Sequence, residues 1–416
     1  MRHYSLVILF LLFYPLLQGQ ELETTPPEFI RTIQFKGEQE FTGTPIIALG
    51  QPMSLEFDDL IGDEADYFYT IEHFNFDWTP SDLSKNEFMS GFDDVRILNY
   101  ENSFNTLQIY SHYKLNIPNK NTRRLKVSGN YMVKVWDENR DLVFSRKFMV
   151  YEDIALIKVE IKRSRKLKYI NTKQVVNFSV DGSDNILFRN PNQNLKTLII
   201  PNNNLQKSIY NLKPQYSVGN EQIYKYDQEA SFWGGNEYLF FDNKDVRGST
   251  MNIRSIELLD IYNTYLFADK VRKFDPYTYN PDINGNFVVN TLQGDNANIQ
   301  AEYTWVHFYL NNYERLNGGE VHIYGNFNNY SLDDSTKLTY NSKKDVYETK
   351  RLFKQGFYNY KYVLLEKDGT INEGYFSGDF DKTENQYTVL AYYKELGGRY
   401  DRIIGVGSGS SRNITN

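Results

Sequence analysis

The chain has 416 residues, a formal net charge of −7 and no cysteine, and aromatic residues make up 16% of it. This length allows two or three domains of the usual ~100–200 residues. The absence of cysteine excludes a disulfide framework, a cysteine-ligated zinc site, a thiol nucleophile and a lipid-modified cysteine. The diffuse acidity argues against a nucleic-acid partner, because phosphate binding requires a basic face.

The first twenty residues predict a secretory signal peptide. A short basic start with Arg2 and His3 precedes an apolar stretch from Leu6 to Leu17. This stretch is shorter than the roughly 20 apolar residues that are needed to cross a bilayer. We therefore expect an exported protein whose mature chain starts near Glu21, with no membrane-spanning segment after it.

Residues 21–152 predict an immunoglobulin-like β-sandwich. Short alternating stretches such as IRTIQF and DYFYTIEHF are each bounded by Gly, Pro, Asn or Asp. This pattern is typical of antiparallel strands with turns every ~8–12 residues. The clearest predicted hairpin joins residues 131–136 to residues 142–151 through the turn DENRD.

The stretch FNFDWTPSDL, residues 74–83, ends one of these strands. Thr79-Pro80 stops the ladder because Pro has no N–H to donate, and Ser81 is expected to cap a short helix within residues 81–89. Two interpretations are open: a corner that anchors Trp78 against the sandwich, or a loop over residues 82–96 that contacts a partner. The candidate partner-contact residues are Asp77, Trp78, Pro80, Asp82, Phe88, Phe92 and Arg96.

Residues 153–298 predict a second β-rich domain that ends in an Asn-rich loop or linker. Stretches such as LIKVEIK and LKTLIIP alternate with Asn runs, and Asn favours turns because it tolerates left-handed backbone. The basic run KRSRKLK, residues 162–168, predicts an edge strand or hairpin, since Lys on an edge blocks unwanted strand pairing. The other interpretation of this run is contact with an acidic partner.

Residues 299–416 predict a third β-sandwich with a flexible Gly-rich tail. AEYTWVHFYL alternates, and Tyr358, Tyr360 and Tyr362 share one face of a later strand. No sustained amphipathic helix is found in any window. The fold class is therefore all-β, with tandem immunoglobulin-like or early-set β-sandwich domains.

No catalytic constellation is found in the sequence. The histidines after the first twenty residues do not have the H-E-x-x-H spacing of a metal site. The sequence also has no G-x-S-x-G elbow and no phosphate-binding loop. We therefore expect no catalytic, metal-binding or cofactor-binding residues and a protein that is not an enzyme.

Long ordered runs resemble one family. IEHFNFDW (71–78), TPSDLSKNEFMSGFDDVRI, YENSFNT and SGNYMVKVWDENRDLVFSRKFMVYED look like the first domain of the plug proteins of the type 9 secretion system of Bacteroidetes, and residues 383–407 resemble the C-terminal signature of that family. The resemblance implies a periplasmic, non-catalytic β-protein that binds the periplasmic end of the outer-membrane translocon barrel and closes its pore when no substrate is exported. Such a protein is associated with the inner face of the outer membrane through this partner.

The third segment has a second, weaker resemblance. VHIYGNFNNY (321–330) followed by GFYNYKYVLLEKDG is similar to the glycogen- and starch-binding sandwiches of glycoside hydrolases, although Tyr330 stands where those modules usually carry Trp. The resemblance implies a candidate glycan-stacking face and an alternative function as a secreted carbohydrate-binding module. The residues of this face are Phe327, Tyr330, Tyr358 and Tyr360.

Overall fold

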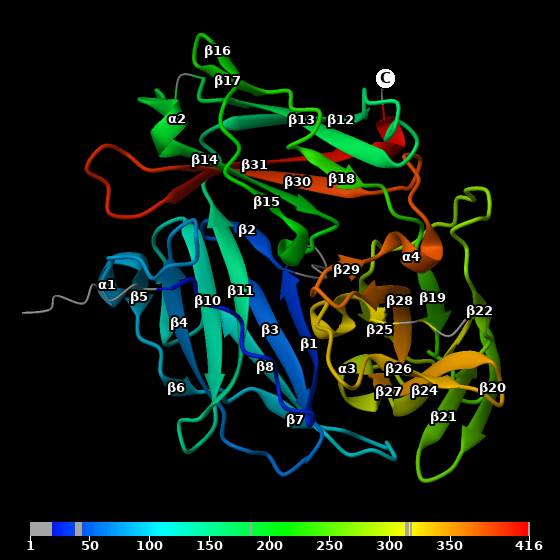
Figure 1. Cartoon of the computed structure of the whole chain (residues 1–416). Helices are drawn as coiled ribbons and strands as arrows, with labels where there is room; N and C mark the ends of the chain where they lie inside the picture. The colour runs from blue at the N-terminus through cyan, green and yellow to red at the C-terminus, as the bar shows by residue number, and fades with distance from the viewer. Residues whose placement is uncertain (1–18, 38–43, 184, 313–315, 317, 415–416) are drawn as a thin grey trace, which may run out of the picture.

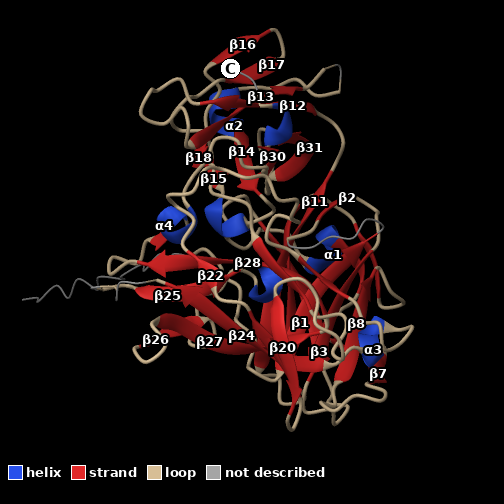
Figure 2. Ribbon diagram, turned by 90° about the vertical axis from the view of Figure 1, so that its right-hand side faces the viewer, coloured by secondary structure: helices blue, strands red, loops and turns tan. Residues whose placement is uncertain are grey.

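The computed structural model describes residues 19–37, 44–183, 185–312, 316 and 318–414. The predicted signal peptide lies outside these residues apart from Gly19 and Gln20. Within the described residues the strands form three β-sandwiches, which confirms the all-β prediction. In Figure 1 the sandwich that contains the C-terminal strands lies above the other two, and Figure 2 shows it at the same upper end after a 90° turn.

The first sandwich spans residues 30–151. Its strands pair in two main sheets and one short ribbon. One sheet has the order β1(Ile30–Gly37), β3(Met53–Asp59), β8(Ser111–Ile117), β7(Tyr100–Asn102). The other has the order β2(Ile46–Ala48), β11(Leu142–Tyr151), β10(Gly129–Trp136), β4(Phe68–Phe74), β6(Val95–Arg96), and the ribbon is β5(Met89–Gly91) with β9(Thr122–Leu125). The predicted hairpin is confirmed, because β10 and β11 pair antiparallel.

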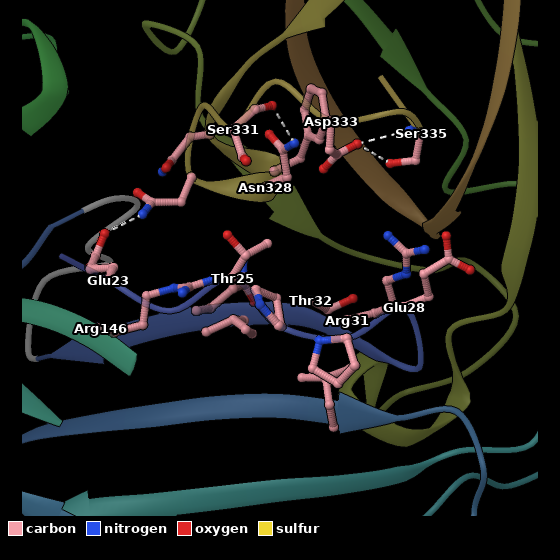
Figure 3. Close-up of a pocket in the computed structure, with 18 of the residues that line it drawn as sticks. Glu23, Thr25, Glu28, Arg31, Thr32, Arg146, Asn328, Ser331, Asp333 and Ser335 are labelled. Atoms are coloured by element: carbon pink, nitrogen blue, oxygen red, sulfur yellow. Dashed lines mark hydrogen bonds between the residues drawn. The ribbon is translucent and has the colours of Figure 1, made fainter. Parts of the chain in front are cut away.

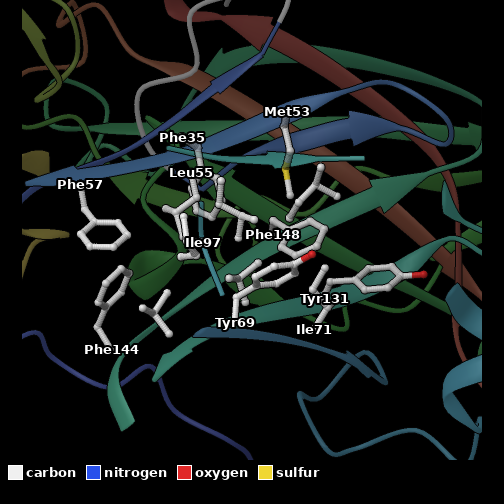
Figure 4. Packing of buried hydrophobic residues seen from close by; sticks show 14 of the residues in the cluster. Phe35, Met53, Leu55, Phe57, Tyr69, Ile71, Ile97, Tyr131, Phe144 and Phe148 are labelled. Carbon is white, nitrogen blue, oxygen red and sulfur yellow. The ribbon is translucent and has the colours of Figure 1, made fainter. Parts of the chain in front are cut away.

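Alternation along these strands builds the core of the first sandwich. Leu55 and Phe57 of β3 are fully buried and face Phe144 and Phe148 of β11 across the sandwich (Figure 4). Phe57 stacks on Tyr113 with ring centroids 5.1 Å apart and meets Phe144 edge-on at 5.2 Å. Such offset and edge-on ring pairs add to the stabilisation from apolar burial.

A single helical turn, α1(Lys85–Phe88), follows the predicted corner. The helix was expected in this region, but the prediction that Ser81 caps it is wrong. Ser84 is the N-cap, and the Glu87 carboxylate accepts hydrogen bonds from the Ser84 backbone N–H and hydroxyl at 2.8 Å in a capping box. Ser81 instead bonds the Nδ1 of His73 at 2.8 Å.

The middle sandwich combines two distant parts of the chain, residues 154–233 and residues 385–414. One sheet has the order β12(Leu156–Arg163), β13(Lys173–Asp181), β17(Glu221–Tyr224), β16(Tyr216–Val218), with β18(Ser231–Trp233) also on β13. The other has the order β15(Ile209–Tyr210), β14(Leu195–Pro201), β30(Gln386–Tyr393), β31(Arg402–Ser410). The short helices α2(Pro191–Asn194), η1(Leu205–Lys207) and η3(Ser411–Asn413) belong to it.

The inserted sandwich spans residues 239–377. Its strands follow the order β19(Leu239–Asp242), β28(Gly356–Leu365), β25(Glu320–Tyr324), β26(Lys337–Asn341), β27(Val346–Lys354), β24(Tyr303–Asn311), β21(Tyr262–Leu266), β20(Ile253–Leu258). The remaining elements are β22(Asp269–Lys270), β23(Phe287–Val289), β29(Ile371–Asn372), α3(Ala297–Gln300), α4(Gly374–Ser377) and η2(Asn326–Asn328).

Strand pairing divides the chain differently from the expected boundaries at residues 152/153 and 298/299. The C-terminal strand β30 pairs with β14 along its length, from Leu195 opposite Tyr393 to Pro201 opposite Tyr387. The strands from β19 to β29 therefore form an insertion in the middle sandwich. The chain does pass to its second unit near residue 153, because β12 begins at Leu156. The basic run 162–168 begins with the last two residues of β12, Lys162 and Arg163, and continues into the loop after it. β12 is an edge strand of its sheet, in agreement with the edge-strand interpretation.

Candidate functional site

The stretch FNFDWTPSDL forms the joint between the first and middle sandwiches. Phe74, Phe76 and Trp78 are buried in one cluster with Leu198 and Tyr392 of the middle sandwich. Trp78 is fully buried at a left-handed φ of 62°, and the Lys147 ammonium lies 4.2 Å from the centre of its ring. Trp78 is therefore a buried anchor at a corner of the fold, as the first interpretation expected, and it is not available to contact another protein.

His73 lies beneath this joint as a neutral side chain. Its Nδ1 is 2.8 Å from the Ser81 hydroxyl and its Nε2 is 3.2 Å from the Ser128 carbonyl, which fits a ring that carries its proton on Nε2. Burial lowers the pKa of His73 to about 4, and the Ser128 carbonyl and Asp401 oppose this only in part. Protonation would place a cation in the core.

This histidine predicts a pH dependence of stability. The pKa of His73 is lower in the folded chain than in the unfolded chain. Between pH ~6.5 and ~4 the unfolded chain therefore binds a proton that the folded chain does not bind. The free energy of unfolding of the wild type should fall with decreasing pH by up to about 1.4 kcal/mol per pH unit more than that of His73→Gln. Urea titrations at half-unit steps measure both slopes, and parallel slopes would contradict the assignment.

The other candidate contact residues do not form one surface. Phe88 is buried against Tyr131, and Arg96 pairs with Asp66 at 2.5 Å. Pro80 is half-buried in a bridge to Phe74. Asp77, Asp82 and Phe92 are exposed. Partner contact through the loop 82–96 can therefore involve Asp82 and Phe92, and it stays a prediction.

The candidate glycan face lies largely inside the inserted sandwich. Tyr358 and Tyr360 are buried around Phe241, and their hydroxyls donate to the Lys354 carbonyl and to Asp269 at 2.7 Å. Tyr330 is also buried, and Phe327 is half-buried against Phe353. The expectation of an exposed stacking platform is wrong for the three tyrosines. Tyr358 and Tyr360 lie on the face of β28 that forms the core, and Tyr330, which follows η2, is buried in a separate cluster with Tyr324 and Val363.

A buried charge network joins the first and inserted sandwiches. Asp58 of β3 accepts hydrogen bonds from the Lys354 ammonium at 2.7 Å and from the Tyr303 hydroxyl at 2.6 Å, and it pairs with His112 at 2.7 Å. Burial alone would raise the pKa of Asp58, but Lys354 and His112 outweigh it and hold the pKa below its usual range. Asp58 and Lys354 are 0% and 1% exposed, so water cannot replace either partner.

A cavity of about 310 Å³ lies between the same two sandwiches. Residues 23–28, β1 and β11 form one wall, and residues 326–335 around η2 form the other. Figure 3 shows Arg31 and Arg146 on the first wall and Asn328 and Asp333 on the second. An adjoining cavity of about 400 Å³ shares part of this lining and reaches Tyr210 of the middle sandwich, so the two together border all three sandwiches.

Three segments expose apolar side chains: the loop after β3, the loop after β7 and the β20–β21 hairpin. The hairpin and the loops near β7 lie at the lower end of the molecule in Figure 1. The loop after β7 is held by hydrogen bonds from Phe104 N–H to the Ile299 carbonyl and from Leu107 N–H to Glu302, both at 2.8 Å. The hairpin tip lies level with residues 301–303, because β21 runs parallel to β24 with Asn263 opposite Trp305. We call this set the apolar end surface: Ile61, Phe104, Leu107, Ile109, Leu258 and Leu259, each at least 50% exposed.

Sequence reasoning missed the charged residues of the joint and of the cavity. Arg146-Lys147 stands inside the otherwise apolar strand LVFSRKFMVY, and Glu56 and Asp58 alternate with Leu55 and Phe57. A charged pair between apolar residues was the available signal. This pattern does not show which distant segment of the chain covers the charged side chains.

Neither a metal cluster nor a membrane-crossing helix is found in the part of the chain that the structure describes. Over these residues no group of three or more His, Cys, Asp or Glu side chains could hold a metal ion. No helix among them is long and apolar enough to cross a membrane.

Comparisons with known proteins identify a matching family model and similar solved structures. The model for the first domain of the type 9 secretion system plug protein matches residues 30–152, the first sandwich. The crystal structure of a hypothetical protein from Parabacteroides merdae ATCC 43184 is similar at 30% sequence identity, with a TM-score of 0.89. The similarity covers 94% of this chain and 100% of that one. No curated protein sequence matches the chain.

Proposed function

The chain belongs to the type 9 secretion system plug protein family, and we propose that it binds the periplasmic end of the outer-membrane translocon barrel of that system and closes its pore when no substrate is being exported. The observation that carries this proposal is the family match over the whole first sandwich. Under this proposal the protein is exported to the periplasm, acts at the inner face of the outer membrane and performs no catalysis.

The joints between the sandwiches suit a protein that closes an opening. Phe76, Trp78 and Tyr392 fill the joint of the first and middle sandwiches, and the Asp58–Lys354 pair closes the joint of the first and inserted sandwiches. Relative domain motion is the default where an interface is small and polar. Buried aromatic and ionic joints oppose such motion and support a body that keeps its shape against the pore.

We assign the contact with the translocon to the apolar end surface. Groups of exposed apolar side chains that are rimmed by polar residues mark sites of protein interaction. Exposed carboxylates adjoin them in sequence at Asp63, Glu64, Glu257 and Asp260. The complementary partner is a protein surface with an apolar centre and a basic rim.

Deletion of the gene should make the outer membrane permeable to large antibiotics. An open translocon pore admits molecules that the intact membrane excludes, so susceptibility should rise and return to normal with the wild-type gene supplied in trans. A second deletion that removes the translocon barrel controls for the route of entry. Susceptibility that stays high in the double deletion would contradict pore closure, because the leak would not pass through the barrel.

The apolar end surface predicts a selective loss of binding. Phe104→Asp should weaken co-purification with the translocon barrel by about tenfold or more, because an apolar anchor at the centre of an interface contributes ~2 kcal/mol. Phe267→Asp is the matched control, since Phe267 is 57% exposed and follows the opposite end of β21. Equal retention of the two variants, with unchanged unfolding temperatures, would exclude this surface.

A further inference from the structure

The cavity between the first and inserted sandwiches has more cationic hydrogen-bonding capacity than the protein uses. Arg146 is 9% exposed, and within the described residues it makes one hydrogen bond, from Nη1 to the carbonyl of the neighbouring Ser145 at 2.8 Å. The Nε of Arg31 is buried without a hydrogen-bond partner among the same residues. A guanidinium stays protonated and keeps five N–H donors. The donors of Arg31 and Arg146 that have no partner in the described part of the chain can therefore bind the acceptors of a ligand.

A third guanidinium faces the same cavity from the inserted sandwich. Arg351 of β27 is 6% exposed and donates to the Ser335 hydroxyl, and its Nη1 lies 3.5 Å from the Asp333 carboxylate. Burial and the nearby charge of Arg31 lower the pKa of Arg351 to about 10. Two cations that line one cavity and are close enough to affect each other indicate a place for an anionic group between them.

The carboxylates that line the cavity neutralise these arginines only in part. Glu23 opposes the effect of burial on the pKa of Arg146, but it also accepts from the Lys147 backbone N–H and from the Asn329 amide, both at 2.6 Å. Asp333 accepts from the N–H groups of Ser335 and Thr336 in a turn, in addition to its contact with Arg351. Glu28 and Asp334 are exposed. Each inner carboxylate is thus shared between an arginine and other donors, and the two outer ones lie toward solvent.

The chemistry of the lining selects a singly charged ligand with apolar atoms. Four basic and four acidic side chains line the cavity, so a doubly charged phosphate would be incompletely neutralised. Apolar side chains complete the walls, among them Pro27, Ile33, Phe287 and Phe327. The side-chain amide oxygen Oδ1 of Asn328 is buried without a partner among the described residues and can accept an N–H from a ligand backbone. A peptide carries both groups.

We propose that this cavity binds a glutamate or aspartate carboxylate on an extended peptide segment of a partner protein. Arg31 and Arg351, whose charges act on each other, hold the carboxylate, and Arg146 on the Glu23 side of the cavity is open to a second acidic group of the segment. The adjoining cavity toward Tyr210 accommodates the residues that flank them. At about 310 Å³ the cavity lies at the lower end of the size range of ligand sites, which fits one side chain with part of its backbone. The proposal does not depend on the translocon, because the site lies apart from the apolar end surface.

The test uses the purified full chain and two capped hexapeptides, Gly-Ser-Glu-Ser-Glu-Gly and its isostere with both Glu residues replaced by Gln. Isothermal titration calorimetry at low salt should give binding of the Glu peptide at least tenfold tighter than that of the Gln peptide. Arg31→Gln and Arg146→Met should each weaken binding of the Glu peptide about tenfold. Arg140→Met is the matched control, because Arg140 is an exposed arginine paired with Asp94 on the far end of β11.

Each alternative result has a defined meaning. Equal affinity for the two peptides, or no binding of either at millimolar concentration, would overturn the proposal, as would an affinity unchanged in both arginine variants. If inorganic phosphate binds more tightly than the Glu peptide, the site prefers a free oxyanion to a peptide carboxylate, and the proposal is also overturned. If Arg146→Met fails to fold, the peptide pair and Arg31→Gln decide the question.

Discussion

Asp58→Asn should lower the free energy of unfolding by about 3–5 kcal/mol, the range for breaking a buried ion pair by removing one partner. Lys354 would then keep its charge at 1% exposure with the Asn298 carbonyl as its acceptor, at 2.6 Å. Tyr303 also donates to Asp58, and the asparagine side chain has one acceptor atom for these two donors. Denaturant titration followed by tryptophan fluorescence and circular dichroism measures the loss.

A double variant and an exposed pair control this experiment. Asp58→Asn combined with Lys354→Met removes both charges and should be less destabilised than Asp58→Asn alone, because no buried cation is left. Lys344→Ala breaks the exposed Lys344–Glu348 pair and should cost no more than about 0.5 kcal/mol. A loss below about 1 kcal/mol for Asp58→Asn would show that the two sandwiches do not depend on the network.

Trp78→Ala should cost about 3–5 kcal/mol, the range for replacing a buried aromatic side chain by a methyl group. Trp78 is fully buried between Phe74 and the apolar side chains of the middle sandwich, and Lys147 covers its ring. The turn geometry adds to the cost, since alanine retains the strain of the left-handed φ without the packing. Limited proteolysis should also accelerate, because the joint between the two sandwiches loosens.

Trp233→Ala is the matched control for this variant. Trp233 is 56% exposed on the edge of the middle sandwich, where it touches Tyr169 and Lys173. It should cost less than about 1 kcal/mol, as is usual for surface substitutions. Equal costs for the two tryptophans would contradict the assignment of Trp78 to the joint.

Local pattern predicted many of the strands and turns. The hairpin β10–β11, the single helical turn within residues 81–89 and the edge position of β12 each follow from residues within about ten positions of one another. The prediction that Thr79-Pro80 stops the ladder is wrong, because β4 ends at Phe74 and Pro80 returns to pair with Phe74 in an isolated bridge. Alternation, turn residues and the missing N–H of proline act at this range. The wrong prediction of Ser81 as the N-cap is also a matter of short range. Ser84 is the N-cap because the Glu87 side chain reaches its backbone N–H and hydroxyl.

The sequence by itself determined an all-β chain without cysteine and the ordered runs that mark its family. The tertiary structure alone decided the rest. Only the pairing of β14 with β30, almost two hundred residues apart, shows that one sandwich is inserted in another. Only the covering of β3 on both faces buries its alternating acids Glu56 and Asp58. The physical reason is common to both, because strand partners and burial depend on contacts between distant segments, which local periodicity does not encode.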